Sequence, residues 1–164
     1  MGRYVLLVLA AMLCSKVGAS VGTLQLVGQA RLEFMIWPIY DSRLYSIDGS
    51  YQEGQLPLRL DVQYLRDVDA EDLVKHTQSE WQRQGLAHVG EQQWLVTLSR
   101  LLPSVRKNDV LTLAVDDKGS STFLVNGEPL GRIDDPHFGQ HFLAIWLSPN
   151  TSRPELRQAL LGLD

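Results

Sequence analysis

Tyr64 and Arg66, near the middle of the chain, could together bind a carboxylate. They end an alternating stretch, and in a strand their side chains would point to the same face. The apolar residues of that face are Leu58, Leu60 and Val62. A guanidinium gives a carboxylate two parallel hydrogen bonds and a phenol adds a hydroxyl, which predicts a site for a small apolar acid at the mouth of a cavity. The alternative is structural, with Arg66 paired to a neighbouring aspartate, Asp67 or Asp69, because an unpaired buried charge is too costly.

Arg31 and Tyr40 form a second candidate set for ligand binding. Arg31 alternates with Leu32, so in a strand it could face solvent while Leu32 packs inward. Tyr40 and Tyr45 could line a cavity, but aromatic side chains in strands are also ordinary core residues. Both interpretations of this set stay open at the level of sequence.

His137 and His141 have the i, i+4 spacing of two metal ligands on one helical face, with two aspartates close by. Asp135 and Pro136 are also explained as the start of a helix, and no glutamate lies between the histidines to act as a base. The chain has neither a glycine-rich phosphate loop nor a Gly-x-Ser-x-Gly elbow. We therefore expect no metal ion and no cofactor, and we assign no catalytic residue.

Residues 1–19 have the layout of a secretory signal peptide. Arg3 supplies a positive start, an apolar run follows, and small residues precede position 20. We expect cleavage at Ala19–Ser20 and a mature domain over residues 20–164, in the periplasm or secreted, with no stable membrane anchor. Two alternatives remain open: an uncleaved N-terminal helix, and lipid attachment at Cys14, which would anchor the protein to a membrane.

The charge balance argues against nucleic acid as a partner. Without Arg3 and Lys16 the chain keeps 13 basic residues against 19 acidic ones, so its net charge is about −6. No basic stripe remains to follow a phosphate backbone. The mature part also lacks cysteine, so its stability must come from a hydrophobic core, and a chain of this length can bury one.

Alternation of apolar and polar residues predicts strands. They are expected over residues 23–37, with a turn or bulge at Gly28-Gln29, and over residues 40–47, 56–66, 110–115 and 122–125. Asp48-Gly49-Ser50 is typical of a turn, and Asn126-Gly127 is a strong hairpin signal.

A period of 3.6 residues predicts helices in the remaining segments. We expect one over residues 69–85 with Asp69 as N-cap, and one from about residue 91 that is interrupted at Pro103. A third helix is expected from Asp135, and a short one over residues 156–161 after the capping box Ser152-Arg153-Pro154-Glu155. Strands that cluster, rather than alternate with helices, predict an α+β fold with an antiparallel sheet covered on one side by helices.

The order of several segments resembles that of the chalcone isomerase-like family. The matching segments are residues 28–31 leading into Trp37-Pro38-Ile39-Tyr40-Asp41-Ser42-Arg43-Leu44-Tyr45, residues 62–68, Val125-Asn126-Gly127 followed by Gly131-Arg132-Ile133, residues 142–147, and Glu155-Leu156-Arg157. This resemblance covers nearly all of the mature chain. It implies an open-faced sandwich, in which a large antiparallel sheet is covered by a layer of helices.

The same resemblance implies two kinds of function. Family members include plant enzymes that isomerise chalcones, relatives that bind fatty acids through an Arg and a Tyr, and relatives with no known activity. No basic residue stands at 21–23, where the isomerases have a reactive Arg, and their Tyr, Lys and Asn correspond to Asp72, Lys75 and Ser79. We therefore expect a non-catalytic protein that binds a fatty acid or a similar acid between sheet and helices. The alternatives are a divergent isomerase (intramolecular lyase) and an envelope interaction module without a ligand.

Overall fold

The computed structural model describes residues 23–163, so the predicted signal peptide and Cys14 lie outside the described residues. A single six-stranded sheet runs through this part of the chain, with every neighbouring pair antiparallel and the strands in sequence order. Its strands are β1 (Gln25–Phe34), β2 (Trp37–Ser46), β3 (Leu58–Tyr64), β4 (Val110–Val115), β5 (Ser121–Val125) and β6 (Glu128–Ile133). The predicted bulge is present, since the β1–β2 register shifts between Leu26 and Gly28.

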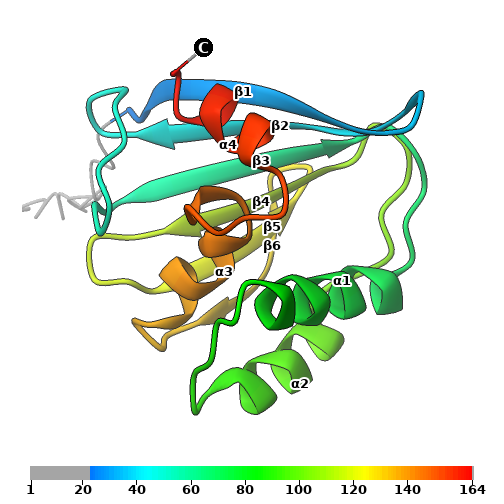
Figure 1. Ribbon diagram of the computed structural model, residues 1–164. Coiled ribbons are helices and arrows are strands. Elements are labelled where there is room, and N and C mark those ends of the chain that lie inside the picture. The colour runs from blue at the N-terminus through cyan, green and yellow to red at the C-terminus, as the bar shows by residue number, and fades with distance from the viewer. Residues whose placement is uncertain (1–22, 164) are drawn as a thin grey trace, which may run out of the picture.

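Four helices lie on one side of this sheet (Figure 1). They are α1 (Ala70–Arg83), α2 (Glu91–Leu101), α3 (Phe138–Leu147) and α4 (Pro154–Leu160). The predicted α+β fold with a one-sided helix layer is therefore confirmed. Among residues 23–163, none of the helices has the length and apolar character needed to span a bilayer.

The interruption expected at Pro103 is present, because α2 ends at Leu101, two residues before it. Two helix starts differ from the sequence-based expectation. α3 begins at Phe138 rather than at Asp135, whose side chain instead accepts a hydrogen bond from the backbone N–H of His137. The predicted capping box does not form at α4. The Ser152 hydroxyl donates to the carboxylate of Glu80 on α1, 2.8 Å away, because that buried carboxylate needs a partner.

The two faces of β3 show how the sheet separates core from solvent. The alternate residues Leu58, Leu60, Val62 and Tyr64 are buried under the helices. On the other face, Arg59 forms two hydrogen bonds of 2.7–2.8 Å with Asp61, which also accepts one from the Thr112 hydroxyl on β4. One face is thus apolar, and the other carries polar contacts within β3 and between β3 and β4.

α4 packs closely against β1 at Gly28. A Cβ atom at this position would collide with the carbonyl oxygens of Ala159 and Leu160 at the end of α4. The glycine therefore sets how near the helix can come to the strand, and it places the segment before α4 next to the end of the helix layer.

Candidate functional site

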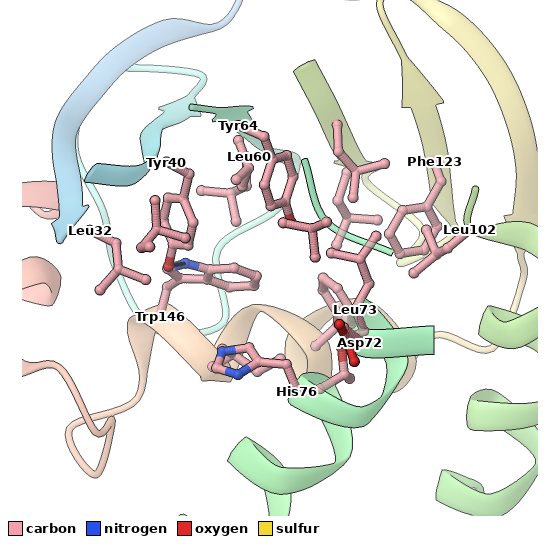
Figure 2. A pocket seen from close by; sticks show the side chains of 18 residues that line it. Leu32, Tyr40, Leu60, Tyr64, Asp72, Leu73, His76, Leu102, Phe123 and Trp146 are labelled. Atoms are coloured by element: carbon pink, nitrogen blue, oxygen red, sulfur yellow. Dashed lines mark hydrogen bonds between the residues drawn. The ribbon is translucent and has the colours of Figure 1, made fainter. Parts of the chain in front are cut away.

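An apolar cavity of about 320 Å³ lies between the sheet and the helices (Figure 2). Five strands contribute to its floor and α1 and α3 to its roof. The apolar lining consists of Leu32, Ile39, Leu60, Val62, Val68, Leu73, Leu102, Leu111, Leu113, Phe123, Phe142 and Ile145. We call this space the main cavity. Its volume is at the lower end of the roughly 300–1,000 Å³ of small-molecule sites.

Few polar side chains line the main cavity. They are Tyr40, Tyr64, Asp72, His76, Thr77 and Trp146. The Thr77 hydroxyl is already used, because it donates to the backbone carbonyl of Leu73 at 2.9 Å. The remaining groups come from β2, β3, α1 and α3, so they converge on the cavity from both layers.

Tyr40 is tied to the helix layer by Trp146. The indole N–H of Trp146 donates to the Tyr40 hydroxyl at 2.9 Å (Figure 2). Burial raises the pKa of Tyr40 to about 12, so its hydroxyl is neutral at physiological pH. Because the oxygen accepts from the indole, the Tyr40 O–H itself is left to donate to a ligand.

Tyr64 lies beside Tyr40 in an edge-to-face arrangement, with ring centroids 6.0 Å apart. Burial raises the pKa of Tyr64 above its ordinary value of 10.0, and the neighbouring Tyr40 adds to this rise. Neither phenol can therefore supply a phenolate at neutral pH. Both can act as hydrogen-bond donors at the edge of an apolar space.

His76 stands on the exposed border of α1, one turn after Asp72. The side chain is exposed, yet the protein atoms around the imidazole remove part of its hydration and lower the pKa of His76 below its ordinary value of 6.5. Nearby Glu80 acts in the opposite direction, and Arg83 and Arg153 add to the lowering. A neutral imidazole therefore marks the edge of the main cavity at neutral pH.

A second hollow of about 250 Å³ adjoins the main cavity. It shares with that cavity Leu32, Tyr40, His76, Ile145 and Trp146, and it adds Phe34, Glu80, Arg83, Thr151, Ser152, Arg153 and Leu156. We call it the side hollow. Arg83 is paired with Glu80 at 3.6 Å, whereas no carboxylate lies within 4.0 Å of Arg153 among residues 23–163. Arg153 is thus an exposed cation at the polar end of the combined space.

The structure does not bring Arg66 to the main cavity, unlike Tyr64. β3 ends at Tyr64, and the chain bends at Leu65 and Arg66 before Val68 pairs with Val105. Alternation stops at this bend, so Arg66 is exposed and absent from the lining. The expectation that both residues share one inward face is corrected. No aspartate pairs with Arg66 either, within the described part of the chain.

The second candidate set is also divided. Arg31 lies on the outer face of β1 and forms two hydrogen bonds of 2.7 and 2.9 Å with Asp41, directly opposite on β2. This pair holds the pKa of the Asp41 carboxyl below its usual value. Arg31 therefore faces solvent, whereas Tyr40 lines the main cavity.

The histidines of α3 have partners other than a metal. The ring of His141 lies 2.9 Å from Glu91, and that of His137 lies 3.2 Å from Asp135. Within residues 23–163 no three His, Cys, Asp or Glu side chains are grouped so that they could hold a metal ion.

The positions that correspond to the isomerase residues point in different directions. Asp72 borders the main cavity, but Lys75 is exposed and paired with Glu71 at 2.8 Å, and Ser79 is exposed. Only one of the three positions therefore faces the site.

Sequence reasoning missed three residues of the site: Trp146, His76 and Arg153. Trp146 lies on α3, where it is half-buried and borders both spaces. His76 immediately precedes the buried Thr77 on α1, and a residue beside an apolar stripe belongs to the rim of whatever that stripe covers. Arg153 lies in the predicted capping box, and that local interpretation gives no reason to expect the side chain beside the cavity.

Comparisons with known proteins agree with this architecture. A family model described as chalcone isomerase-like matches residues 15–162. An uncharacterized protein of Haemophilus influenzae is 30% identical over 139 residues, which are 84% of this chain and 68% of the relative. The crystal structure of a fatty-acid binding protein of Arabidopsis thaliana superposes with a TM-score of 0.65 over 88% of each chain, at 12% identity. At that identity the likeness shows the fold alone.

Proposed function

The chain belongs to the chalcone isomerase-like family, and we propose that it binds a small amphiphilic acid, such as a fatty acid, between its sheet and its helices. The observation that carries this proposal is the main cavity, which is lined largely by aliphatic and aromatic side chains and has tyrosine hydroxyls and a histidine on its border. A core packed without voids would favour an interaction module without a ligand. A cavity of about 320 Å³ favours a ligand.

The tail of the ligand would lie in the main cavity. Leu60 on the sheet and Leu73 on α1 lie on opposite sides of this space (Figure 2), and Val62 on β3 also lines it. Each methylene that leaves water for such surroundings contributes about 0.8 kcal/mol before the cost of ordering the ligand. The tail thus supplies affinity, and it selects only for length and shape.

The carboxylate of the ligand would lie at the side hollow. Arg153 offers a guanidinium that is not paired with a described carboxylate, and the Tyr40 O–H is free to donate. His76 stands between the two spaces and adds a further donor when protonated. Arg153 therefore takes the part that the sequence suggested for Arg66. Tyr64, whose hydroxyl was expected beside the carboxylate, lines the main cavity and not the side hollow.

The fold neighbour supports the same class of ligand. The superposing Arabidopsis protein is described as a fatty-acid binding protein, which supports an acid of this class by analogy of fold. We further propose that the chain acts after export, as residues 1–19 suggest.

Calorimetric titration with dodecanoic acid and with dodecan-1-ol tests this proposal. The lipid-free wild type should bind both ligands. Arg153→Met keeps the length of the side chain and removes its charge, so it should weaken the acid about fivefold or more and change the alcohol little. Arg66→Met is the matched control, because Arg66 is also an exposed arginine but does not line the cavity. Failure of the wild type to bind either ligand contradicts the function. Equal weakening of acid and alcohol contradicts only the assignment of Arg153.

A divergent isomerase or lyase is the second candidate. It is favoured by the convergence of the Tyr40 and Tyr64 hydroxyls with His76 on one cavity, since enzymes of this kind need several donors around an enolate or phenolate. Against it, the one position that keeps the lysine of the isomerases, Lys75, is exposed and paired with Glu71. A turnover of chalcone that increases in proportion to protein concentration and is lost in Tyr64→Phe would favour this candidate.

A further inference from the structure

The hairpin between β1 and β2 carries four consecutive apolar side chains into solvent. Phe34, Met35, Ile36 and Trp37 are 60%, 82%, 81% and 64% exposed. We call these four residues the apolar tip. They form one end of the sheet, at the right-hand side of Figure 1. Among residues 23–163 the other large exposed apolar side chains are Leu26, Ile47, Val89 and Leu163. Half of the exposed apolar side chains are thus concentrated at one turn, and contiguous exposure of this kind marks an interaction site.

The backbone of the apolar tip indicates that its side chains are there for a reason other than folding. Phe34 pairs with Trp37, so the turn has two residues, and its first one, Met35, has a φ of 57°. Glycine is usual at this position because a side chain is strained there. The β5–β6 hairpin of the same sheet uses the expected Asn126-Gly127. The chain therefore keeps an apolar residue where the turn itself would favour glycine.

We propose that the apolar tip inserts into the surface of a phospholipid bilayer. Trp and Phe favour the layer between headgroups and acyl chains, and the strength of such binding grows with the apolar area that is buried. The tip is a narrow protrusion of four residues, which suits entry into a fluid layer. A standard protein interface instead uses roughly 20–30 residues on each side, so a second copy of the chain is a poorer fit.

Charges near the tip are compatible with a lipid surface. Phe34 lines the side hollow together with the exposed Arg83 and Arg153, and basic side chains beside an inserted tip are attracted to anionic headgroups. Glu33 is also exposed on this hairpin, and the full chain carries a formal net charge of −4. Apolar insertion is therefore the main contribution, and charge is secondary.

The position of the tip connects this surface to the cavity. Leu32, two residues before Phe34, lines both the side hollow and the main cavity. With the tip in the bilayer, the opening of the side hollow would lie next to the layer of the membrane in which the head group of an amphiphilic acid resides. A ligand could then enter without crossing bulk water. This last step rests on the proposed function, whereas docking of the tip does not.

Flotation with vesicles of phosphatidylethanolamine and a minor share of phosphatidylglycerol tests the docking. The wild type should float with the vesicles, and Met35→Gly/Ile36→Ser should reduce the bound fraction about fivefold or more. That double variant installs the residues that the turn prefers, so it should fold at least as stably as the wild type. Val89→Ser is the matched control, because Val89 is 97% exposed but lies in the connection between α1 and α2, and it should float like the wild type.

Tryptophan fluorescence gives a second readout. Trp81 and Trp94 are buried and Trp146 is half-buried, whereas Trp37 is exposed. Vesicles should shift the emission of the wild type to shorter wavelength, and Trp37→Phe should lose the shift while keeping most of the binding.

Absence of flotation by the wild type, or equal flotation of the double variant, overturns the proposal. A sedimentation result in which the wild type is a dimer and the double variant is a monomer also overturns the proposal, because the tip would then be an interface between two copies of the chain. Calorimetry with dodecanoic acid should be unchanged in the double variant, which separates docking from ligand binding.

Discussion

Trp146 on α3 donates its indole N–H to the hydroxyl of Tyr40 on β2, 2.9 Å away, at the border that the main cavity and the side hollow share. This hydrogen bond joins the helix layer to the sheet at the point where the apolar tail of the proposed ligand would meet its head group. It also orients the Tyr40 hydroxyl, because an oxygen that accepts from the indole keeps its own proton for another acceptor.

Tyr40→Phe should therefore affect both stability and binding. The substitution leaves the half-buried indole N–H of Trp146 without its partner, which should lower the free energy of unfolding by about 1–3 kcal/mol. It should also weaken dodecanoic acid, because a donor to the carboxylate is lost. Tyr64→Phe is the control: no hydrogen bond contributes to the pKa shift of Tyr64, so stability should change by less than about 0.5 kcal/mol. Urea denaturation and calorimetry measure these effects, and equal stability losses in the two variants would contradict the role of the hydrogen bond.

Val62→Phe should fill the main cavity at modest cost to stability. Val62 lies in the middle of β3 and lines the cavity, so the larger ring has space to occupy. Binding of dodecanoic acid and dodecan-1-ol should fall together, since both tails lose the same room. Val115→Phe is the matched control on β4, because Val115 is buried and its methyl groups lie 2.8–2.9 Å from where a Cβ on Gly139 would stand. There the ring has no space and should destabilise the fold by about 1–3 kcal/mol. Thermal unfolding measures both variants, and an equal loss of stability in the two would show that the cavity is absent in solution.

The sheet could be predicted from sequence because its signals are local and agree with one another. In β3 the alternation of Leu58, Leu60, Val62 and Tyr64 coincides with burial at each position, and Asn126-Gly127 forms the turn that its residue types favour. Similarly, Leu73, Thr77 and Trp81 recur at the helical spacing of α1 and are buried. Patterns of this kind depend on few distant contacts.

The errors arose where a distant contact decides a local boundary. Alternation continues through Arg66 in the sequence, but β3 ends at Tyr64 and the chain bends at Leu65 and Arg66, after which Val68 pairs with the distant Val105. Ser152 fits a capping box, but the buried carboxylate of Glu80 takes its hydroxyl. Neither the residues around Arg66 nor those around Ser152 indicate these distant contacts. The sequence therefore predicts Arg66 as the cation of the site, whereas the structure offers Arg153 before α4.

Export remains a prediction from the first residues of the chain. We expect cleavage at Ala19–Ser20, because an apolar run after Arg3 leads to small residues at that bond. Intact-mass analysis of the protein from the envelope fraction of its native cells measures this. A mature chain that begins at Ser20 is the expected result. A retained Met1 would support an uncleaved helix, and a diacylglyceryl mass on Cys14 would support a lipoprotein; either would contradict a free mature domain.

Binding of the acid should become tighter as the pH falls through the range in which His76 titrates. Crowding lowers the pKa of His76 from 6.5 in the free protein, and a carboxylate bound beside it would raise that pKa again. Binding would then be accompanied by proton uptake, so the affinity for the acid should rise as the pH falls. This holds at pH values above about 4.3, the ordinary pKa of a carboxyl group, because the ligand is ionised there. Dodecan-1-ol carries no charge that could interact with His76, so its affinity should not show this pH dependence.

The same shift has the opposite effect on the free protein. Because the folded-state pKa of His76 is below that of the unfolded chain, the unfolded state binds the proton more readily, and stability falls as the pH drops below about 6.5. His141, whose pKa is also lowered by burial, acts in the same direction. His76→Gln should therefore remove the pH dependence of acid binding between about pH 8 and pH 5.5 while only part of the pH dependence of unfolding disappears. Titrations of acid and alcohol across this range, with wild type and variant, measure both effects. An acid affinity that follows the same curve in the variant would show that His76 lies away from the bound carboxylate, and the head group would then have to be sought elsewhere on the cavity border.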